Sequence, residues 1–259
     1  MPEADSTSSP VVLITGASRG IGSAVSRTMA HAGYRVALTG RNQIRLEALR
    51  EELAEVAPTM TVVADLREPD APDKILHAVE EQFGSPHVLI NNAGTAPSSR
   101  IEESSNEDLE EVLDLHVRVP FQLIRAALPA MRKQTGSCVI QIASTAGLDG
   151  FPFTAAYTAA KHGMVGLTRA LAAELNTESP RMYAICPGFV DTDITHQAAA
   201  DIANRGRKTE TEALKALGAM NSIGRLHTAA EVADAVMYLI RDQPQGCVYN
   251  LDSEPPRFV

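Results

Sequence analysis

The chain of 259 residues has no tryptophan, and aromatic residues make up 4% of it. It has no run of about 18 consecutive apolar residues, so we expect neither a membrane-spanning helix nor a membrane partner. Basic residues are outnumbered: 23 lysines and arginines face 32 aspartates and glutamates, for a net charge of −9. Because contacts to nucleic-acid phosphates need clustered basic side chains, this balance argues against nucleic-acid binding and favours a small solute or a protein partner.

Cysteine is also rare. Cys138, Cys186 and Cys247 are too few and too far apart for a disulfide framework or a paired-cysteine metal site, so we expect no metal. Each lies in an apolar stretch, which indicates buried thiols in a reducing, cytoplasmic environment. The first ten residues lack the basic and apolar parts of a secretory signal, and we expect 1–9 to be a disordered tail.

From Pro10 onward, short apolar segments alternate with longer segments of helical periodicity. Near-continuous apolar strands are typical of a parallel sheet covered by helices on both faces. No interior change of composition marks a linker, so 10–259 is predicted to be one doubly wound α/β domain of the Rossmann type with a seven-stranded parallel sheet. The predicted strands are 11–15, 35–39, 60–64, 87–90, 138–143, 182–186 and 247–251, and the later helices 106–133, 154–178 and 229–241.

The polar, alanine-rich stretch 193–227 departs from this alternation. It follows the predicted strand 182–186. Ligands of open α/β sheets bind beyond the carboxyl ends of the strands, so an insertion there is well placed to be a substrate lid. An exposed helical excursion explains the stretch equally well.

The turn after the first strand reads TGASRGIG (15–22). Glycines in such a turn let the backbone bend sharply and approach a pyrophosphate, to which the N-terminus of the next helix offers free N–H groups. The turn therefore predicts a dinucleotide site, although a tight turn alone would explain one or two of the glycines. The residues assigned to it are Gly16, Ser18, Arg19, Gly20, Ile21 and Gly22.

The second strand ends without the acid that binds the ribose 2′-hydroxyl in NAD sites. Arg41 stands in that place, and Arg19 projects from the glycine turn. Because arginine pairs well with phosphate, this favours NADP(H) over NAD(H), with solvated surface arginines as the alternative. Asp65, at the end of the third strand, is placed either to accept a hydrogen bond from adenine or to cap a helix.

Tyr157 and Lys161 are four residues apart on a predicted helix, so their side chains face the same way. An ammonium group next to a phenol favours the phenolate and lowers the phenol's pKa from its ordinary value of about 10. The pair is a candidate general acid/base unit. Ser144, at the carboxyl end of a predicted strand, is placed to hold a substrate oxygen, unless it merely forms a turn.

Four motifs follow one another in order: TGASRGIG (15–22), NNAG (91–94), Ser144 with YTAAK (157–161), and PGFVDT (187–192). In these the chain resembles the short-chain dehydrogenase/reductase family. The resemblance implies that Lys161 also binds the nicotinamide ribose and that Thr192 reaches the carboxamide. The further predicted cofactor contacts are Arg41, Asp65, Leu66, Asn92, Ala93, Gly94, Tyr157, Pro187, Gly188 and Val190.

One position departs from the family's pattern: His116 stands where the family usually has a catalytic asparagine. Pro120 has no N–H, so the carbonyl of His116 loses its helical partner. In the family, a kink here exposes this carbonyl to a water linked to the lysine. We therefore place His116 in a proton relay, and packing between helices is an equally weighted alternative.

Together these residues predict an NADPH-dependent carbonyl reductase, or a secondary-alcohol dehydrogenase in reverse. Tyr157 donates the proton, Ser144 orients the oxygen and Lys161 lowers the tyrosine pKa. The alternatives are a 3-oxoacyl reductase with Arg132 and Lys133 as candidate carrier-docking residues, an NAD-linked alcohol dehydrogenase, and an NADP(H)-binding sensor or scaffold with weak or no turnover.

The predicted substrate is a small ketone or hydroxy compound. Apolar residues near the catalytic groups outline either a substrate cleft or internal packing: Phe151, Pro152, Phe153, Phe189, Ala96 and Ile101. The resemblance also implies that the two long helices pair across a two-fold axis, in a homodimer or homotetramer.

Overall fold

The computed structural model describes residues 9–176, 178–206 and 208–259. In this part of the chain, eight strands form one sheet in the order β3-β2-β1-β4-β5-β6-β7-β8. Because β1 and β4 are neighbours, the two halves of the sheet wind away from a switch point between them. The strands are β1 (Val11–Thr15), β2 (Arg35–Gly40), β3 (Thr59–Val63), β4 (Val88–Asn91), β5 (Cys138–Ile142), β6 (Arg181–Cys186), β7 (Val248–Asn250) and β8 (Arg257–Phe258).

The sheet differs from the predicted seven parallel strands by one short strand. All seven predicted strands are present and parallel, with bounds within one residue of those expected. β8 is additional and pairs antiparallel with β7, through Tyr249 with Phe258 and Asn250 with Arg257. A strand of two residues is too short for a hydrophobic period, so the sequence carried no signal for it.

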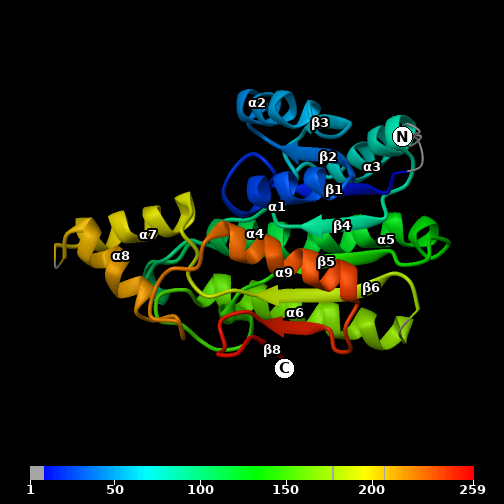
Figure 1. Ribbon diagram of the computed structural model, residues 1–259. Coiled ribbons are helices and arrows are strands. Elements are labelled where there is room, and N and C mark those ends of the chain that lie inside the picture. The colour runs from blue at the N-terminus through cyan, green and yellow to red at the C-terminus, as the bar shows by residue number, and fades with distance from the viewer. Residues whose placement is uncertain (1–8, 177, 207) are drawn as a thin grey trace.

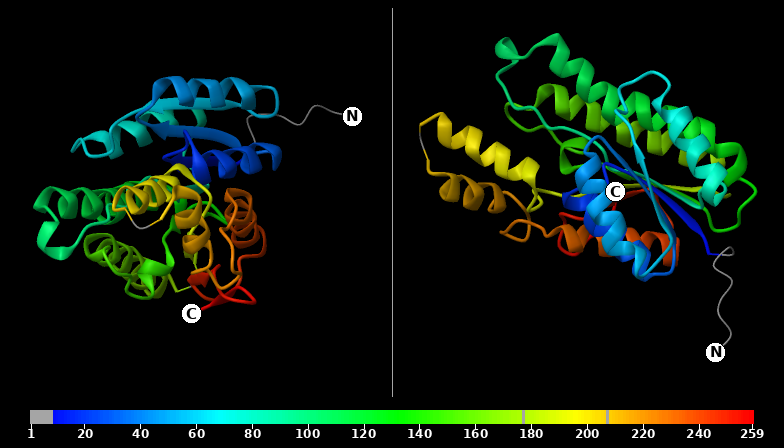
Figure 2. Two further views of the ribbon diagram at one scale, coloured as in Figure 1. Left: turned by 90° about the vertical axis from the view of Figure 1, so that its left-hand side faces the viewer. Right: turned by 90° about the horizontal axis from the view of Figure 1, so that it is seen from above.

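Helices cover both faces of the sheet, as the view from above in Figure 2 shows. Along β1 the side chains alternate: Val12 and Ile14 join the core on one face, and Leu13 joins the core on the other. The first face packs against α1 (Gly20–His31), α2 (Gln43–Ala54) and α9 (Ala229–Asp242), and the second against α3 (Ala71–Phe83), α5 (Val119–Met131) and α6 (Ala155–Leu175). The prediction of a doubly wound α/β domain is confirmed.

The predicted helix 106–133 is divided into three segments. α4 (Asn106–Leu113) runs into a π-helical turn (Asp114–Arg118), which continues as α5. Within it the Val119 N–H donates to the Asp114 carbonyl, five residues back. Pro120, near the start of α5, has no N–H to offer His116. The turn places Leu115 and His116 in the interior, and π-turns of this kind often lie at functional sites.

Residues 193–227 contain a helical hairpin, which projects to the left of the sheet in Figure 1. Its helices are α7 (Asp193–Asn204) and α8 (Glu210–Gly218), and residue 207 between them lies outside the described residues. Ala199, Ala213 and Leu217 form a small core between the two helices. At the base of the hairpin, Val190 and His227 form a parallel β-bridge. The role of this hairpin as a substrate lid stays a prediction.

The three cysteines are free thiols; Cys138 and Cys186 are buried as predicted, whereas Cys247 is partly exposed. Within the described residues, no helix is both long and apolar enough to cross a membrane. The same residues contain no group of three or more His, Cys, Asp or Glu side chains suited to a metal ion. Of the predicted tail, 1–8 lies outside the described residues, and the Ser9 carbonyl accepts a hydrogen bond from Arg35 Nε at 2.9 Å.

Candidate active site

A cavity of about 1200 Å³ opens at the carboxyl edge of the sheet, over the switch point between β1 and β4. Ligands of doubly wound sheets bind at this position. Nearly all of the predicted site residues line it: Gly16, Ser18, Arg19, Gly20, Ile21, Arg41, Asp65, Leu66, Asn92, Ala93, Gly94, His116, Ser144, Tyr157, Lys161, Pro187, Gly188, Val190 and Thr192. Gly22 is buried behind this lining.

The glycine turn is held rigidly against the NNAG segment. Gly16 has a φ of +64°, and a Cβ there would lie 2.8 Å from the Ala93 Cα. A Cβ on Gly22 would collide with the Gly16 carbonyl oxygen. The Asn92 Nδ2 donates to the carbonyls of Thr15 at 2.9 Å and Gly16 at 3.1 Å. The turn therefore presents bare backbone to the cavity, which fits the close approach of a dinucleotide pyrophosphate.

Three arginines line one end of the cavity. Arg19 precedes α1, Arg41 follows β2, and Arg45 comes from α2. Arg19 and Arg41 were predicted from the sequence, whereas Arg45 was not. Because guanidinium groups pair with phosphate, this end of the cavity fits the 2′-phosphate of NADP(H).

Two carboxylates face these arginines. Asp193 Oδ2 lies 2.8 Å from Arg19 Nη1 and 3.4 Å from Arg45 Nη1. Asp65 is held by Arg67, whose Nη2 is 2.7 Å from Oδ2, and it lies 3.9 Å from Arg41 Nη1. The hydrogen bond from Arg67 is the main reason that the pKa of Asp65 falls to about 2. Asp193 was not among the predicted site residues.

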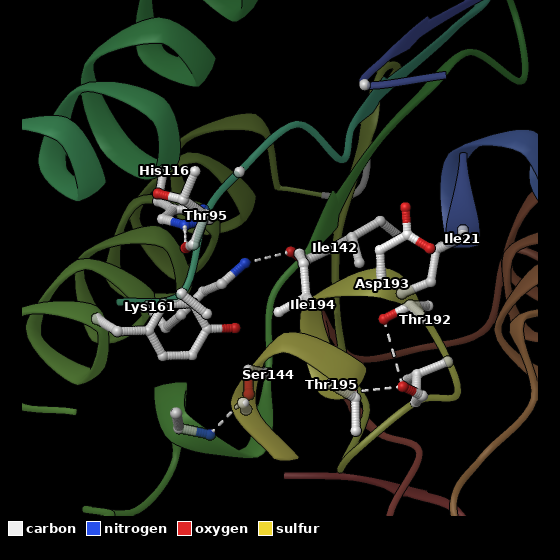
Figure 3. Close-up of a pocket in the computed structure, with 18 of the residues that line it drawn as sticks. Ile21, Thr95, His116, Ile142, Ser144, Lys161, Thr192, Asp193, Ile194 and Thr195 are labelled. Atoms are coloured by element: carbon white, nitrogen blue, oxygen red, sulfur yellow. Dashed lines mark hydrogen bonds between the residues drawn. The ribbon is translucent and has the colours of Figure 1, made fainter. Parts of the chain in front are cut away.

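The predicted catalytic side chains meet at the other end of the cavity (Figure 3). Lys161 Nζ donates to the Ile142 carbonyl at 2.7 Å and lies 5.5 Å from the centroid of the Tyr157 ring. Ser144 Oγ accepts a hydrogen bond from the Ala146 N–H at 3.1 Å, which leaves the serine's own hydrogen to donate. α6 thus carries the Tyr–Lys pair, and the end of β5 delivers the serine beside it.

Burial sets the protonation of this group. It raises the pKa of Tyr157 to about 12, although the hydroxyl of Ser144 opposes the rise. It also lowers the pKa of Lys161 to about 7. The net shift of the tyrosine is thus opposite to the predicted one, because desolvation outweighs any effect of the neighbouring ammonium. At neutral pH Tyr157 is a protonated phenol, the form that donates a proton.

His116 is buried and contacts the Thr95 carbonyl and the Tyr157 ring. Its Nε2 lies 2.8 Å from the Thr95 carbonyl, and its ring meets the Tyr157 ring edge to face, with centroids 5.5 Å apart. Since a carbonyl oxygen only accepts, Nε2 carries the hydrogen and Nδ1 is a bare acceptor. Among the described residues Nδ1 has no hydrogen-bond partner. Burial and the charge of Lys161 lower the pKa of His116 well below its usual value, so the imidazole is neutral.

Gly94 and His116 are coupled by packing. A Cβ on Gly94 would fall on the His116 ring. We therefore expect Gly94→Ala to lower the free energy of unfolding by about 1–3 kcal/mol, the usual cost of overpacking. In the His116→Ala background, which removes the ring, the same change should cost much less, and urea unfolding of the four proteins measures the coupling.

Gly150→Ala provides the control for this cycle, because a Cβ there meets nothing within 4 Å. Its effect should be small and the same in both backgrounds. Additive effects of Gly94→Ala and His116→Ala would contradict the coupling.

The rest of the cavity wall is largely apolar. Of the predicted cleft residues, Phe151, Pro152, Phe153, Phe189 and Ala96 line it, whereas Ile101 does not and is 72% exposed. The hairpin adds lining residues that were not predicted: Ile194, Ala198, Ile202, Leu217 and Met220. Arg100, Asp201 and Arg205 also line the cavity, so this wall is mostly apolar with a few charged groups.

Arg132 and Lys133 lie away from the cavity. They directly follow α5, which ends at the amino edge of the sheet, just before β5 begins. Arg132 Nη2 lies 3.7 Å from Glu174 Oε1 on α6. Neither residue lines the cavity, and carrier docking by them stays a prediction.

The chain is similar in sequence to known oxidoreductases. The family profile described as short chain dehydrogenase matches residues 10–203. The chain is 32% identical over 237 residues to D-beta-hydroxybutyrate dehydrogenase of Rhizobium meliloti, which covers 89% of this chain and 91% of that protein. It is 33% identical over 242 residues to the putative ketoacyl reductase of the monensin polyketide synthase of Streptomyces virginiae, covering 91% and 92%.

Among solved structures, a variant of actinorhodin polyketide ketoreductase in complex with NADPH superposes with a TM-score of 0.89. The sequence identity is 30%, and the match covers 96% of this chain and 98% of the other. The similarity thus extends over the whole sheet, its helices and the cavity.

Proposed function

Because this chain belongs to the short-chain dehydrogenase family, an oxidoreductase family that acts on CH–OH and C=O groups, we propose that it is an NADPH-dependent carbonyl reductase. In reverse it would be a secondary-alcohol dehydrogenase. The observation that carries the proposal is the placement of Ser144, Tyr157 and Lys161 on one cavity with an arginine-lined glycine turn. The apolar wall supports a small ketone or hydroxy compound as substrate.

NADP(H) is the cofactor that these residues fit. The bare backbone of the glycine turn would hold the pyrophosphate, Arg19 and Arg41 the 2′-phosphate, and Thr192, at the start of α7, the nicotinamide end. The NADPH bound to the related ketoreductase supports this assignment. When bound, the reduced nicotinamide supplies the hydride that is added to the carbonyl carbon.

The chain itself supplies the proton and orients the oxygen. Tyr157 donates its phenolic proton to the carbonyl oxygen, and Ser144 donates a hydrogen bond to the same oxygen. The phenolate that remains is stabilised by the Lys161 ammonium and is reprotonated through it. We assign His116 to this relay as a neutral imidazole that accepts a hydrogen bond at Nδ1.

A 3-oxoacyl reductase is the second candidate, favoured by the name of the ketoacyl reductase relative. It uses the same catalytic residues but a substrate whose acyl group is attached to a carrier through a thioester. Arg132 and Lys133 do not line the cavity, so nothing in its lining favours a carrier-bound substrate over a free ketone, and we place this candidate second.

Steady-state oxidation of NADPH with a panel of carbonyl compounds tests the proposal. The panel contains aliphatic, cyclic and aryl ketones together with short 3-oxoacyl thioesters. We expect turnover with at least one free ketone, and a kcat/KM for NADPH at least about tenfold above that for NADH, as two additional charge-assisted phosphate contacts imply. Turnover confined to the thioesters would favour the second candidate, and no turnover of any carbonyl would contradict both.

We further propose that the protein is a homodimer or homotetramer that associates through α4, α5 and α6. This face exposes apolar side chains: Leu109 is 38%, Leu113 37% and Phe121 47% exposed. Apolar groups gathered on one face of neighbouring helices support burial against a second copy.

A further inference from the structure

An ion-pair cluster joins three distant parts of the chain across the cavity. Asp193 is the first residue of α7, Arg19 belongs to the turn after β1, and Arg45 lies on α2. A single oxygen, Asp193 Oδ2, accepts from both guanidinium groups, at 2.8 Å and 3.4 Å. All three residues line the cavity at the end where Arg41 also lies.

The other acid at this end is already satisfied. Asp65 accepts hydrogen bonds from the backbone N–H, Nε and Nη2 of Arg67 and lies 3.9 Å from Arg41. Asp193 is therefore the carboxylate that pairs with the arginines of the glycine turn and α2. Asp193 holds these arginines at the end of the cavity where we expect the 2′-phosphate, because β2 ends without an acid for a ribose 2′-hydroxyl.

Resting on the proposed use of NADP(H), we propose that Asp193 competes with the 2′-phosphate for Arg19 and Arg45, and that Arg45 is a further phosphate-binding residue. The side chains of Arg19, Arg45 and Asp193 are 51%, 53% and 56% exposed. Ion pairs this exposed are weak, so a phosphate that carries more charge and more acceptor oxygens displaces the carboxylate.

The competition bears on cofactor choice. An Asp193 carboxylate near the 2′-phosphate repels it, while a cofactor without this phosphate leaves the ion pairs in place. Asp193 thus lowers the affinity for NADP⁺ and leaves that for NAD⁺ almost unchanged. Asp193 is also the first residue of α7. When the 2′-phosphate replaces its carboxylate on Arg19 and Arg45, phosphate binding therefore releases the start of the hairpin from these arginines.

Equilibrium titration of NADP⁺ and NAD⁺ against charge-neutral variants tests the competition. Asp193→Asn should strengthen NADP⁺ binding about two- to fivefold, the factor that corresponds to an exposed ion pair, and change NAD⁺ binding less than twofold. Arg45→Gln should weaken NADP⁺ binding by a similar factor without affecting NAD⁺. Arg41→Gln serves as the positive control, with a selective loss of NADP⁺ affinity.

Glu210→Gln and Arg50→Gln are the matched controls. Glu210 is an exposed acid in the first turn of α8, and Arg50 is on the same helix as Arg45 but pairs with Glu47. Neither lines the cavity, so each should leave both affinities unchanged. Added salt should reduce the difference between wild type and Asp193→Asn, because it screens exposed charges.

The outcomes separate this inference from the proposed function. Weaker NADP⁺ binding by Asp193→Asn would overturn the competition and show that the carboxylate helps to hold the cofactor. Equal changes in NADP⁺ and NAD⁺ affinity for Arg45→Gln would overturn its role at the phosphate. If the wild-type protein bound neither cofactor, the proposed function itself would fail.

Discussion

Tyr157→Phe is expected to reduce the kcat for ketone reduction about 10²- to 10⁴-fold, the contribution typical of a positioned general acid. The substitution removes one oxygen and its proton and keeps the ring that packs edge to face against His116. The fold and the cofactor site should therefore persist, with the dissociation constant for NADPH within about threefold of wild type. Single-turnover reduction by bound NADPH isolates the chemical step from product release.

Tyr183→Phe is a matched control for this prediction. Tyr183 lies in β6, and its hydroxyl donates to the Pro244 carbonyl at 3.1 Å, away from the cavity lining. This variant loses one hydrogen bond, worth about 1 kcal/mol of stability, and should retain wild-type kcat. A Tyr157→Phe enzyme that turns over as fast as Tyr183→Phe would reject the assigned proton donor.

The parts of the site that the sequence predicted are those set by local pattern. The glycine turn and the NNAG segment each follow a strand that the apolar runs reveal, and parallel strands end at one edge. Their positions in the cavity therefore follow from the strand order. Tyr157 and Lys161 are one helical turn apart, and this spacing alone places them on one face of α6.

The parts that the sequence did not predict depend on long-range packing. Arg19 and Arg45 are separated from Asp193 by 174 and 148 residues, and no local pattern marks the acid as their partner. The acid that pairs with Arg19 and Arg45 is thus supplied from the start of α7. Likewise, the direction of the Tyr157 pKa shift depends on how deeply the phenol is buried. The spacing of Tyr157 and Lys161 on a helix does not determine that depth.

The stability of the wild-type protein relative to a Lys161→Met variant should increase with pH above 7. Burial lowers the pKa of Lys161 from 10.5 to about 7 in the folded protein. Between these values the unfolded chain holds a proton that the folded protein has released. Because the unfolded state then binds more protons, the free energy of unfolding rises by up to about 1.4 kcal/mol per pH unit.

The dependence of stability on pH above 7 separates the titration of Lys161 from the other effects of the Lys161→Met substitution. Methionine also leaves the Ile142 carbonyl without its donor, but that cost does not depend on pH and cancels when two pH values are compared. Urea unfolding at pH 6, 7.5 and 9 should give a wild-type advantage that grows by roughly 2.5 kcal/mol across the range. Below pH 7 both states carry the proton, so the curve should flatten there.

Lys74→Met shows what an exposed lysine does in the same experiment. Lys74 pairs with Asp70 on the surface, and this pair raises the pKa of the ammonium above 10.5. Both folded and unfolded states therefore keep its proton from pH 6 to 9, and the difference from wild type should be constant. If Lys161→Met gave an equally constant difference, Lys161 would remain fully charged in the folded protein throughout the range. The phenolate formed during reduction would then face a permanent cation at neutral pH, instead of a lysine that can give up its proton to Tyr157.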